Sequence, residues 1–155
     1  MDGPQPGDSA PDFSLEGDGG PVTLVGLKGK TVVLYFYPKD DTSGCTAEAK
    51  AFSEMAADFA LAGAIVVGVS KDTVASHAKF RAKYQLEPVL ASDPGGKVVG
   101  AYGVWVEKSL YGRKYMGIER ATFLIDRLGK VARVWRRVRV AGHVNEVLAA
   151  ARLLA

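Results

Sequence analysis

The feature that most limits the fold is an unbroken apolar run at residues 32–37, Val-Val-Leu-Tyr-Phe-Tyr. A strand that is apolar at every position has no face to offer to water, so it must be covered on both sides. Such a strand lies inside a sheet that has further layers of chain above and below it. The run therefore predicts a central strand in a layered α/β protein.

Other segments alternate between helical and strand patterns. We expect a helix at 46–61, a buried strand at 65–69, a helix at 73–84 with Asp72 as its N-cap, a short strand at 88–91 and a short helix at 97–102. Residues 121–125 and 131–140 are expected to be paired strands joined at 127–130, and a last helix begins near His143.

This order predicts an α/β fold with a mixed central β-sheet flanked by helices, a pattern found in thioredoxin-like folds. Residues 1–20 are mostly loop-like, with a turn at Gly19 and Gly20, and we expect an N-terminal β-hairpin extension there. No repeat or long linker divides the 155 residues. We therefore expect a single domain spanning residues 1–155.

Composition narrows the function by exclusion. The chain is 48% hydrophobic and 24% charged, as in ordinary globular proteins, and its net charge of +3 is too small to indicate nucleic-acid binding. The longest apolar region, residues 60–69, is too short to span a membrane. No basic segment followed by an apolar core marks a secretory signal. We expect a cytoplasmic protein without a membrane or nucleic-acid partner.

The chain has one cysteine, Cys45, so an internal disulfide is excluded. The two histidines, His77 and His143, lack metal-ligand spacing to it, and we expect neither a metal nor a cofactor. His77 shares helical spacing with Phe80 and Tyr84. We interpret it as a packing residue of its helix and not as a catalytic base.

Cys45 follows a loop that contains proline and glycine, and it stands at the start of a predicted helix. A helix N-terminus carries unpaired N–H groups and a partial positive charge, which favour thiolate over thiol. Four residues continue the inward stripe from Cys45, namely Ala49, Phe52, Ala56 and Phe59. The thiol should therefore lie half covered on the floor of a pocket, with a cation nearby to compensate its burial. Taken alone, these residues leave an inert, buried cysteine equally open.

Residues 35–49, YFYPKDDTSGCTAEA, closely resemble the active-site loop of peroxiredoxins, whose signature is Pro-x-x-x-Thr-x-x-Cys. Pro38, Thr42 and Cys45 occupy the signature positions. Residues 7–13 resemble the N-terminal segment of the family. Residues 117–126 resemble the strand that supplies its catalytic arginine, here Arg120. The sequence Tyr-Pro-Lys-Asp at residues 37–40 and the glutamate at position 48 resemble the corresponding positions of the PrxQ, or bacterioferritin comigratory protein, subfamily.

The resemblance implies a thiol-dependent peroxidase that reduces hydrogen peroxide and organic hydroperoxides through a cysteine sulfenic acid. By this resemblance Cys45 is the nucleophile, while Arg120 favours its thiolate and holds the peroxide oxygens. The Thr42 hydroxyl would contact the peroxide. Pro38 would shape the loop and shield the sulfur, and Glu48 would orient the arginine.

The chain departs from the subfamily in its resolving cysteine. Lys50 stands where many PrxQ-like proteins carry that cysteine, residues 78–84 contain none, and Ser43 replaces a usual proline. The sulfenic acid must therefore be resolved by another molecule. This resembles the one-cysteine mechanism, with thioredoxin, glutaredoxin or a low-molecular-weight thiol as reductant. We expect a monomer, with a dimer as the alternative.

Two other functions are weighed against the peroxidase. A peroxide sensor or redox relay would oxidise one partner protein, and steady turnover with a general reductant would distinguish the enzyme from it. A nucleic-acid-binding module would use the arginine-rich segment 131–140, whose aromatic residue is Trp135. We interpret that segment as a solvated sheet face. Residues 108–114 form a basic, tyrosine-bearing loop, for which a place at the entrance to the active site is left open, since no spacing argument supports it.

Overall fold

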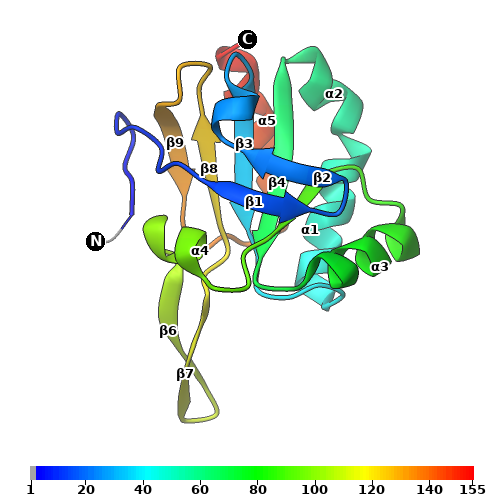
Figure 1. The fold of residues 1–155 in the computed structure, drawn as a ribbon, viewed down its shortest axis with the longest axis vertical. Coiled ribbons are helices and arrows are strands. Elements are labelled where there is room, and N and C mark those ends of the chain that lie inside the picture. The colour runs from blue at the N-terminus through cyan, green and yellow to red at the C-terminus, as the bar shows by residue number, and fades with distance from the viewer. Residues whose placement is uncertain (1–2) are drawn as a thin grey trace.

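The computed structural model describes residues 3–155, and it is built on a seven-stranded mixed sheet (Figure 1). The strand order is β2-β1-β5-β4-β3-β8-β9. The central strand β3 (Thr31–Phe36) pairs in parallel with β4 (Ala64–Ser70) and antiparallel with β8 (Ala121–Ile125). All six residues of β3 are buried. The predicted central strand and mixed sheet are confirmed.

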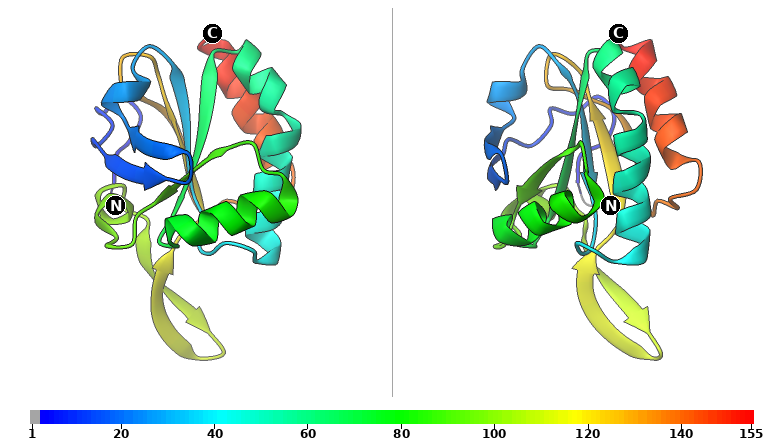
Figure 2. Two further views of the ribbon diagram at one scale, coloured as in Figure 1. Left: turned by 45° about the vertical axis from the view of Figure 1, so that its right-hand side comes forward. Right: turned by 90° about the vertical axis from the view of Figure 1, so that its right-hand side faces the viewer.

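Chain covers both faces of the sheet (Figure 2). One face carries α1 (Ser43–Glu54), α2 (Ala56–Leu61) and α5 (His143–Leu153), and α3 (Val74–Tyr84) adds Phe80 to the same apolar cluster. The other face is covered by the N-terminal segment, η1 (Val25–Leu27) and α4 (Lys97–Ala101). Alternate residues of β3 enter the two clusters, since Leu34 faces one and Tyr35 the other. Cys45 belongs to the cluster under the helices.

The expected N-terminal hairpin is present and extends the sheet. Its strands are β1 (Ser14–Gly17) and β2 (Gly20–Thr23), and β1 also pairs antiparallel with β5 (Val89–Ser92). The loop predicted through residue 20 is therefore wrong for residues 14–17. The turn falls on Asp18 and Gly19, because Gly20 already begins β2.

The single helix predicted at 46–61 is wrong in two respects. It begins three residues earlier, at Ser43, and it is interrupted at Met55 between α1 and α2. The Ser53 hydroxyl donates a 2.8 Å hydrogen bond to the Ala49 carbonyl and accepts one from the Glu87 backbone N–H. Such a serine competes for the carbonyls of the preceding turn and bends a helix.

Thr73, and not Asp72, caps α3. The Thr73 hydroxyl accepts from the Ser76 backbone N–H at 3.1 Å. The carboxylate of Asp72 is engaged elsewhere, by the Asp40 backbone N–H at 2.8 Å and the Ser70 hydroxyl at 2.6 Å. The residue type was a sound N-cap candidate, but tertiary contacts decide which of two neighbours takes the position.

The strand predicted at 131–140 is shorter, because β9 (Val131–Trp135) ends before Arg137 adopts a φ of +49°. A β-bulge opposite Leu124 and Ile125 also changes which face of the sheet the side chains of β9 point to. Trp135 packs with the cluster under the helices, at 5.7 Å between ring centroids from His143, and Arg133 lies over its ring. The segment is therefore not a simple solvated face.

Residues 108–114, expected to be a loop, lie in a two-stranded hairpin of β6 (Trp105–Leu110) and β7 (Arg113–Ile118). It projects from the body of the protein (Figure 1). Tyr111 and Gly112 both have positive φ, 50° and 78°, as a tight two-residue hairpin turn requires. The remaining predicted elements match β5, α4, β8 and α5 within one or two residues. No helix in residues 3–155 is long and apolar enough to cross a membrane.

Candidate functional site

Cys45 is the third residue of α1, at the end of the loop that leaves β3. Its exposure is only 2%, so the expectation of a half-covered thiol is wrong. The cause is that Cys45 lies inside the apolar cluster under the helices. The inward stripe is confirmed for Ala49, Phe52 and Phe59, which are equally buried, whereas Ala56 is only half-buried.

Arg120 is the cation beside the thiol. It directly precedes β8, and the pairing of Ala121 with Phe36 brings it to the end of β3 where the cysteine loop begins. Its Nη2 lies 3.5 Å from the sulfur of Cys45, and its Nη1 donates a 2.8 Å hydrogen bond to Glu48. The structure thus brings together three of the residues that the resemblance selected.

Glu48 is fully buried on the second turn of α1. Burial raises its pKa to about 7, against the opposing charge and hydrogen bond of Arg120. Its Oε1 is paired with Arg120, while Oε2 has no hydrogen-bond partner among the described residues. Burial would lower the pKa of Arg120, but Glu48 and Cys45 raise it above its ordinary value. Arg120 is therefore a cation at any working pH.

Gly44 allows this close approach. A Cβ at residue 44 would lie 3.0 Å from Nη2 of Arg120, closer than side chains normally pack. A larger residue here would push the guanidinium away from its place between Cys45 and Glu48.

Thr42 and Pro38 shape the loop before the thiol, and both are exposed. Thr42 is the N-cap residue of α1, but its hydroxyl donates to the Lys39 carbonyl at 2.8 Å and caps no helical N–H. A hydroxyl engaged as a donor still has oxygen lone pairs to accept a hydrogen bond. Pro38 follows the last buried residue of the strand, Tyr37, and its exposure indicates a part in loop geometry more than in covering the sulfur.

A backbone clamp on Arg120 was not foreseen from the sequence. The Val138 backbone N–H donates to the Arg120 carbonyl at 2.9 Å. The neighbouring Glu119 binds the guanidinium of Arg136 at 2.8 and 2.9 Å and accepts from the Arg137 backbone N–H. The arginine-rich segment thus holds the chain on both sides of Arg120. Its only sequence signal was an unexplained run of cations.

Lys108 is a second cation near the thiol. It lies on β6, half-buried, and its side-chain carbons pass close to Gly117 on β7. Burial and the charge of Arg120 lower its pKa, while Cys45 acts in the opposite direction. The projecting hairpin therefore contributes a charge that interacts with the thiol site, which spacing within the sequence had not indicated.

Both histidines are buried. Within residues 3–155, no three His, Cys, Asp or Glu side chains gather as metal ligands. His143 is buried against the Thr122 hydroxyl, with Nε2 at 2.8 Å, and burial lowers its pKa to about 4. His77 is fully buried on α3, as its spacing predicted.

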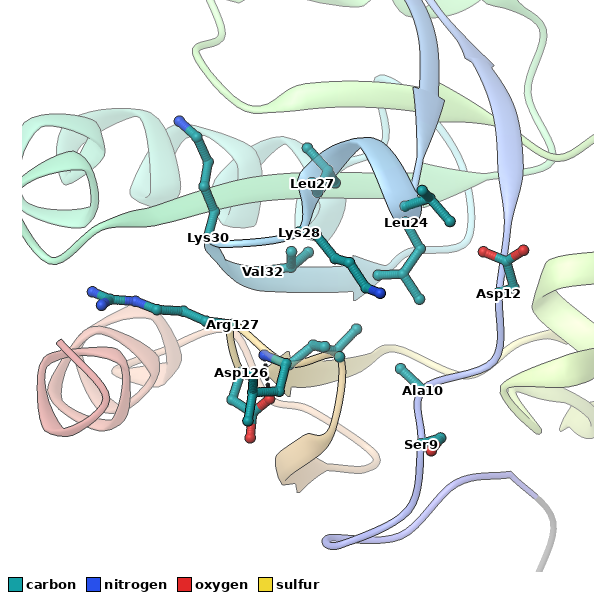
Figure 3. A pocket seen from close by; sticks show the side chains of 14 residues that line it. Ser9, Ala10, Asp12, Leu24, Leu27, Lys28, Lys30, Val32, Asp126 and Arg127 are labelled. Atoms are coloured by element: carbon teal, nitrogen blue, oxygen red, sulfur yellow. Dashed lines mark hydrogen bonds between the residues drawn. The ribbon is translucent and has the colours of Figure 1, made fainter.

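A separate cleft of about 220 Å³ lies at the opposite end of β3 from the thiol (Figure 3). Its walls include the cations Lys28 and Arg127 and the apolar side chains of Leu24 and Val32. None of the candidate catalytic residues lines it. The chemistry of the thiol site therefore does not extend to this cleft.

Comparison with known proteins gives a consistent result. Residues 6–134 match the model of the AhpC/TSA family. Peroxiredoxin Bcp of Bacillus subtilis (strain 168) is 48% identical over 143 residues, which cover 92% of this chain and 91% of the relative.

Two solved structures are also similar. A mutant form of Xylella fastidiosa PrxQ superposes with a TM-score of 0.93 at 35% identity, covering 99% of this chain and 98% of the other. A structure reported for the alkyl peroxide reduction activity of Xanthomonas campestris bacterioferritin comigratory protein has a TM-score of 0.86 at 43% identity, covering 91% and 90%.

Proposed function

This chain belongs to the AhpC/TSA family and to its Bcp/PrxQ peroxiredoxins, and from that premise we propose that Cys45 is its peroxide-reducing thiol. The chain is a thiol-dependent peroxidase with the thioredoxin fold, an oxidoreductase that uses a peroxide substrate and a thiol reductant. The comparisons do not favour the sensor or relay alternative. The observation that carries the assignment of Cys45 is the 3.5 Å approach of Arg120 to its sulfur.

The first half-reaction is a displacement at oxygen. The Cys45 thiolate attacks the terminal oxygen of the hydroperoxide, an S–O bond forms and the O–O bond breaks. The other oxygen leaves with the electron pair of that bond and takes up a proton, giving water or an alcohol. Arg120, already adjacent to the sulfur, stabilises the negative charge that moves from sulfur to the leaving oxygen.

The neighbouring residues prepare this geometry. Glu48 binds the second nitrogen of Arg120 and fixes the plane of the guanidinium. The oxygen of Thr42 accepts a hydrogen bond from the hydroperoxide O–H. Alternatively, the Thr42 hydroxyl turns away from the Lys39 carbonyl and donates its hydrogen bond to the peroxide. Pro38, with its fixed φ, holds the loop at the end of β3. Hydrogen peroxide and organic hydroperoxides are the proposed substrates, in line with the alkyl peroxide activity named for the Xanthomonas protein.

The second half-reaction requires an external thiol, because Cys45 is the only cysteine of the sequence. A thiol attacks the sulfenic acid, forming a mixed disulfide and water, and a second thiol releases Cys45. Thioredoxin, glutaredoxin or a low-molecular-weight thiol is the proposed reductant. Such reductants belong to reducing compartments, so we also propose a cytoplasmic, monomeric, single-domain enzyme.

The test is turnover with each reductant. With hydrogen peroxide alone, the protein should consume one equivalent and stop. Adding thioredoxin with its reductase, or glutathione with glutaredoxin, should restore steady consumption in at least one arm. Cys45→Ser should be inactive in every arm. Continued peroxide consumption by Cys45→Ser would show that the assigned thiol is wrong.

A further inference from the structure

A buried hydrogen-bond network joins α3 to the loop that precedes the thiol. At its centre the Nδ1 atom of His77 lies 2.8 Å from Oδ2 of Asp40, and both side chains are almost completely buried. Asp40 also accepts hydrogen bonds from the Ser76 hydroxyl at 2.7 Å and the Tyr37 hydroxyl at 2.6 Å. Its own backbone N–H donates to Asp72 at 2.8 Å. None of these residues belongs to the proposed catalytic set.

The partners of the imidazole determine where its protons are. Nε2 faces the backbone carbonyl of Ala91 at 3.0 Å, and a carbonyl only accepts, so Nε2 carries a proton. Nδ1 faces a carboxylate that already receives two hydroxyl groups. Although burial would raise the pKa of Asp40, the hydrogen bonds from His77, Tyr37 and Ser76 lower it overall. The 2.8 Å contact between Nδ1 and Oδ2 therefore ties the ring directly to the carboxyl group of Asp40, while Nε2 ties it to the backbone of Ala91.

The same helix holds the next residue of the loop. Asp41 has a φ of +57°, which is unusual for a residue other than glycine. Its carboxylate accepts from Lys83 at 2.8 Å and from the Tyr84 hydroxyl at 2.6 Å, both near the end of α3. Thr42 follows at once as the N-cap of α1, and Cys45 is three residues further. The position of the thiol therefore depends on how α3 holds Asp40 and Asp41.

We propose that His77 is a positioning residue of the peroxidase: through its buried contact with Asp40 it holds the loop that sets Thr42 and the first turn of α1 around Cys45. The proposal rests on the proposed function of Cys45. His77 does not contact the sulfur and acts only through the loop. A buried hydrogen-bonded pair is suited to this role because removing either partner leaves the other with an unsatisfied buried polar group.

The first test is made on the wild-type protein. Histidine side-chain NMR at neutral pH should show a ring N–H of His77 that exchanges slowly with solvent and an Nδ1 atom hydrogen-bonded to a carboxyl group. A ring that exchanges its proton freely with solvent, or an Nδ1 atom without such a hydrogen bond, would overturn the proposal. This measurement requires no variant to fold and no peroxide to react, so its outcome is independent of the proposed function.

The second test uses His77→Gln and Asp40→Asn, with Arg81→Met as the matched control. Arg81 also lies on α3, but it binds Asp18 and the carbonyls of Leu86 and Pro88, away from the loop. Two rates are measured where all variants are fully folded: oxidation of Cys45 by hydrogen peroxide, and its alkylation by iodoacetamide as a function of pH.

His77→Gln should slow oxidation by about 10- to 100-fold and move the alkylation profile to higher pH, since small misplacements of a reacting group have effects of this size. Asp40→Asn should have the same effects, and the double variant should lose little more, because both changes disrupt one hydrogen-bonded pair. Arg81→Met should stay within about threefold of the wild type. Equal effects of His77→Gln and Arg81→Met on both rates, or fully additive losses, would overturn the proposal.

Discussion

Replacing Arg120 by methionine tests the chemistry of the site most sharply. The change removes the positive charge and both guanidinium hydrogen-bond donors but keeps much of the side-chain volume. At the 3.5 Å separation between Nη2 and the sulfur, an effective dielectric constant of about 20 gives an attraction of roughly 5 kcal/mol. Glu48, with a pKa of about 7, is partly ionised and offsets part of this attraction at neutral pH.

The expected result follows from both roles of the guanidinium. Alkylation of Cys45 should require a higher pH in Arg120→Met than in the wild type, because the cation beside the sulfur is lost. Oxidation by hydrogen peroxide at neutral pH should fall by about 100- to 1000-fold, since stabilisation of the leaving oxygen is lost as well. Stopped-flow oxidation and pH-dependent alkylation measure the two effects separately.

Arg127→Met is the matched control, because Arg127 is exposed and lies by the cleft at the far end of β3. It should leave both measurements unchanged. If Arg120→Met retained its oxidation rate within about threefold, the argument that this cation drives the reaction would be refuted.

Three further predictions concern the same site and its surroundings. Burial raises the pKa of Glu48 from 4.5 to about 7 in the folded chain. The free energy of unfolding should therefore fall by roughly 3 kcal/mol as pH rises through this range, and Glu48→Gln should not show this fall. Urea unfolding as a function of pH measures both. His143, whose pKa is lowered to about 4 from 6.5, should cost the fold roughly 3 kcal/mol as pH falls from 6.5 to 4, and His143→Asn should flatten that limb of the stability curve. Gly44→Ala should slow peroxide oxidation by about tenfold or more with little change in melting temperature, because its Cβ displaces Arg120, and an unchanged rate would contradict the crowding seen at 3.0 Å.

Much of the fold follows from local patterns. The run at 32–37 has one arrangement that keeps all of its side chains from water, and the structure places it as the central strand β3. The inward stripe from Cys45 likewise predicted which face of α1 is buried. Sequence patterns were less informative where tertiary contacts decide between two neighbouring residues. Thr73 is the N-cap of α3, because the carboxylate of Asp72 binds the backbone N–H of Asp40 instead.

The candidate site divides in the same way. Cys45, Thr42 and Glu48 lie within seven residues, so one motif finds them, and the family resemblance supplied Arg120 from 75 residues away. Nothing in the spacing of the chain indicated the clamp of Glu119 by Arg136, because that contact arises only once β7 and β9 are in place. His77 shows the limit most clearly. Its helical spacing correctly predicted that the side chain is buried. Its hydrogen-bond contacts with the Ala91 carbonyl and the Asp40 carboxyl group are visible only in the three-dimensional structure.

The most direct test of the account is the mass of the intact protein after one equivalent of hydrogen peroxide at neutral pH, with and without a reagent that traps sulfenic acids. The wild type should gain one oxygen atom on Cys45, or one trap adduct when the reagent is present, while Cys45→Ser gains neither. A wild-type protein that remains unmodified, or oxygen found on another residue, would contradict the claim that Arg120 holds this sulfur ready to break an O–O bond.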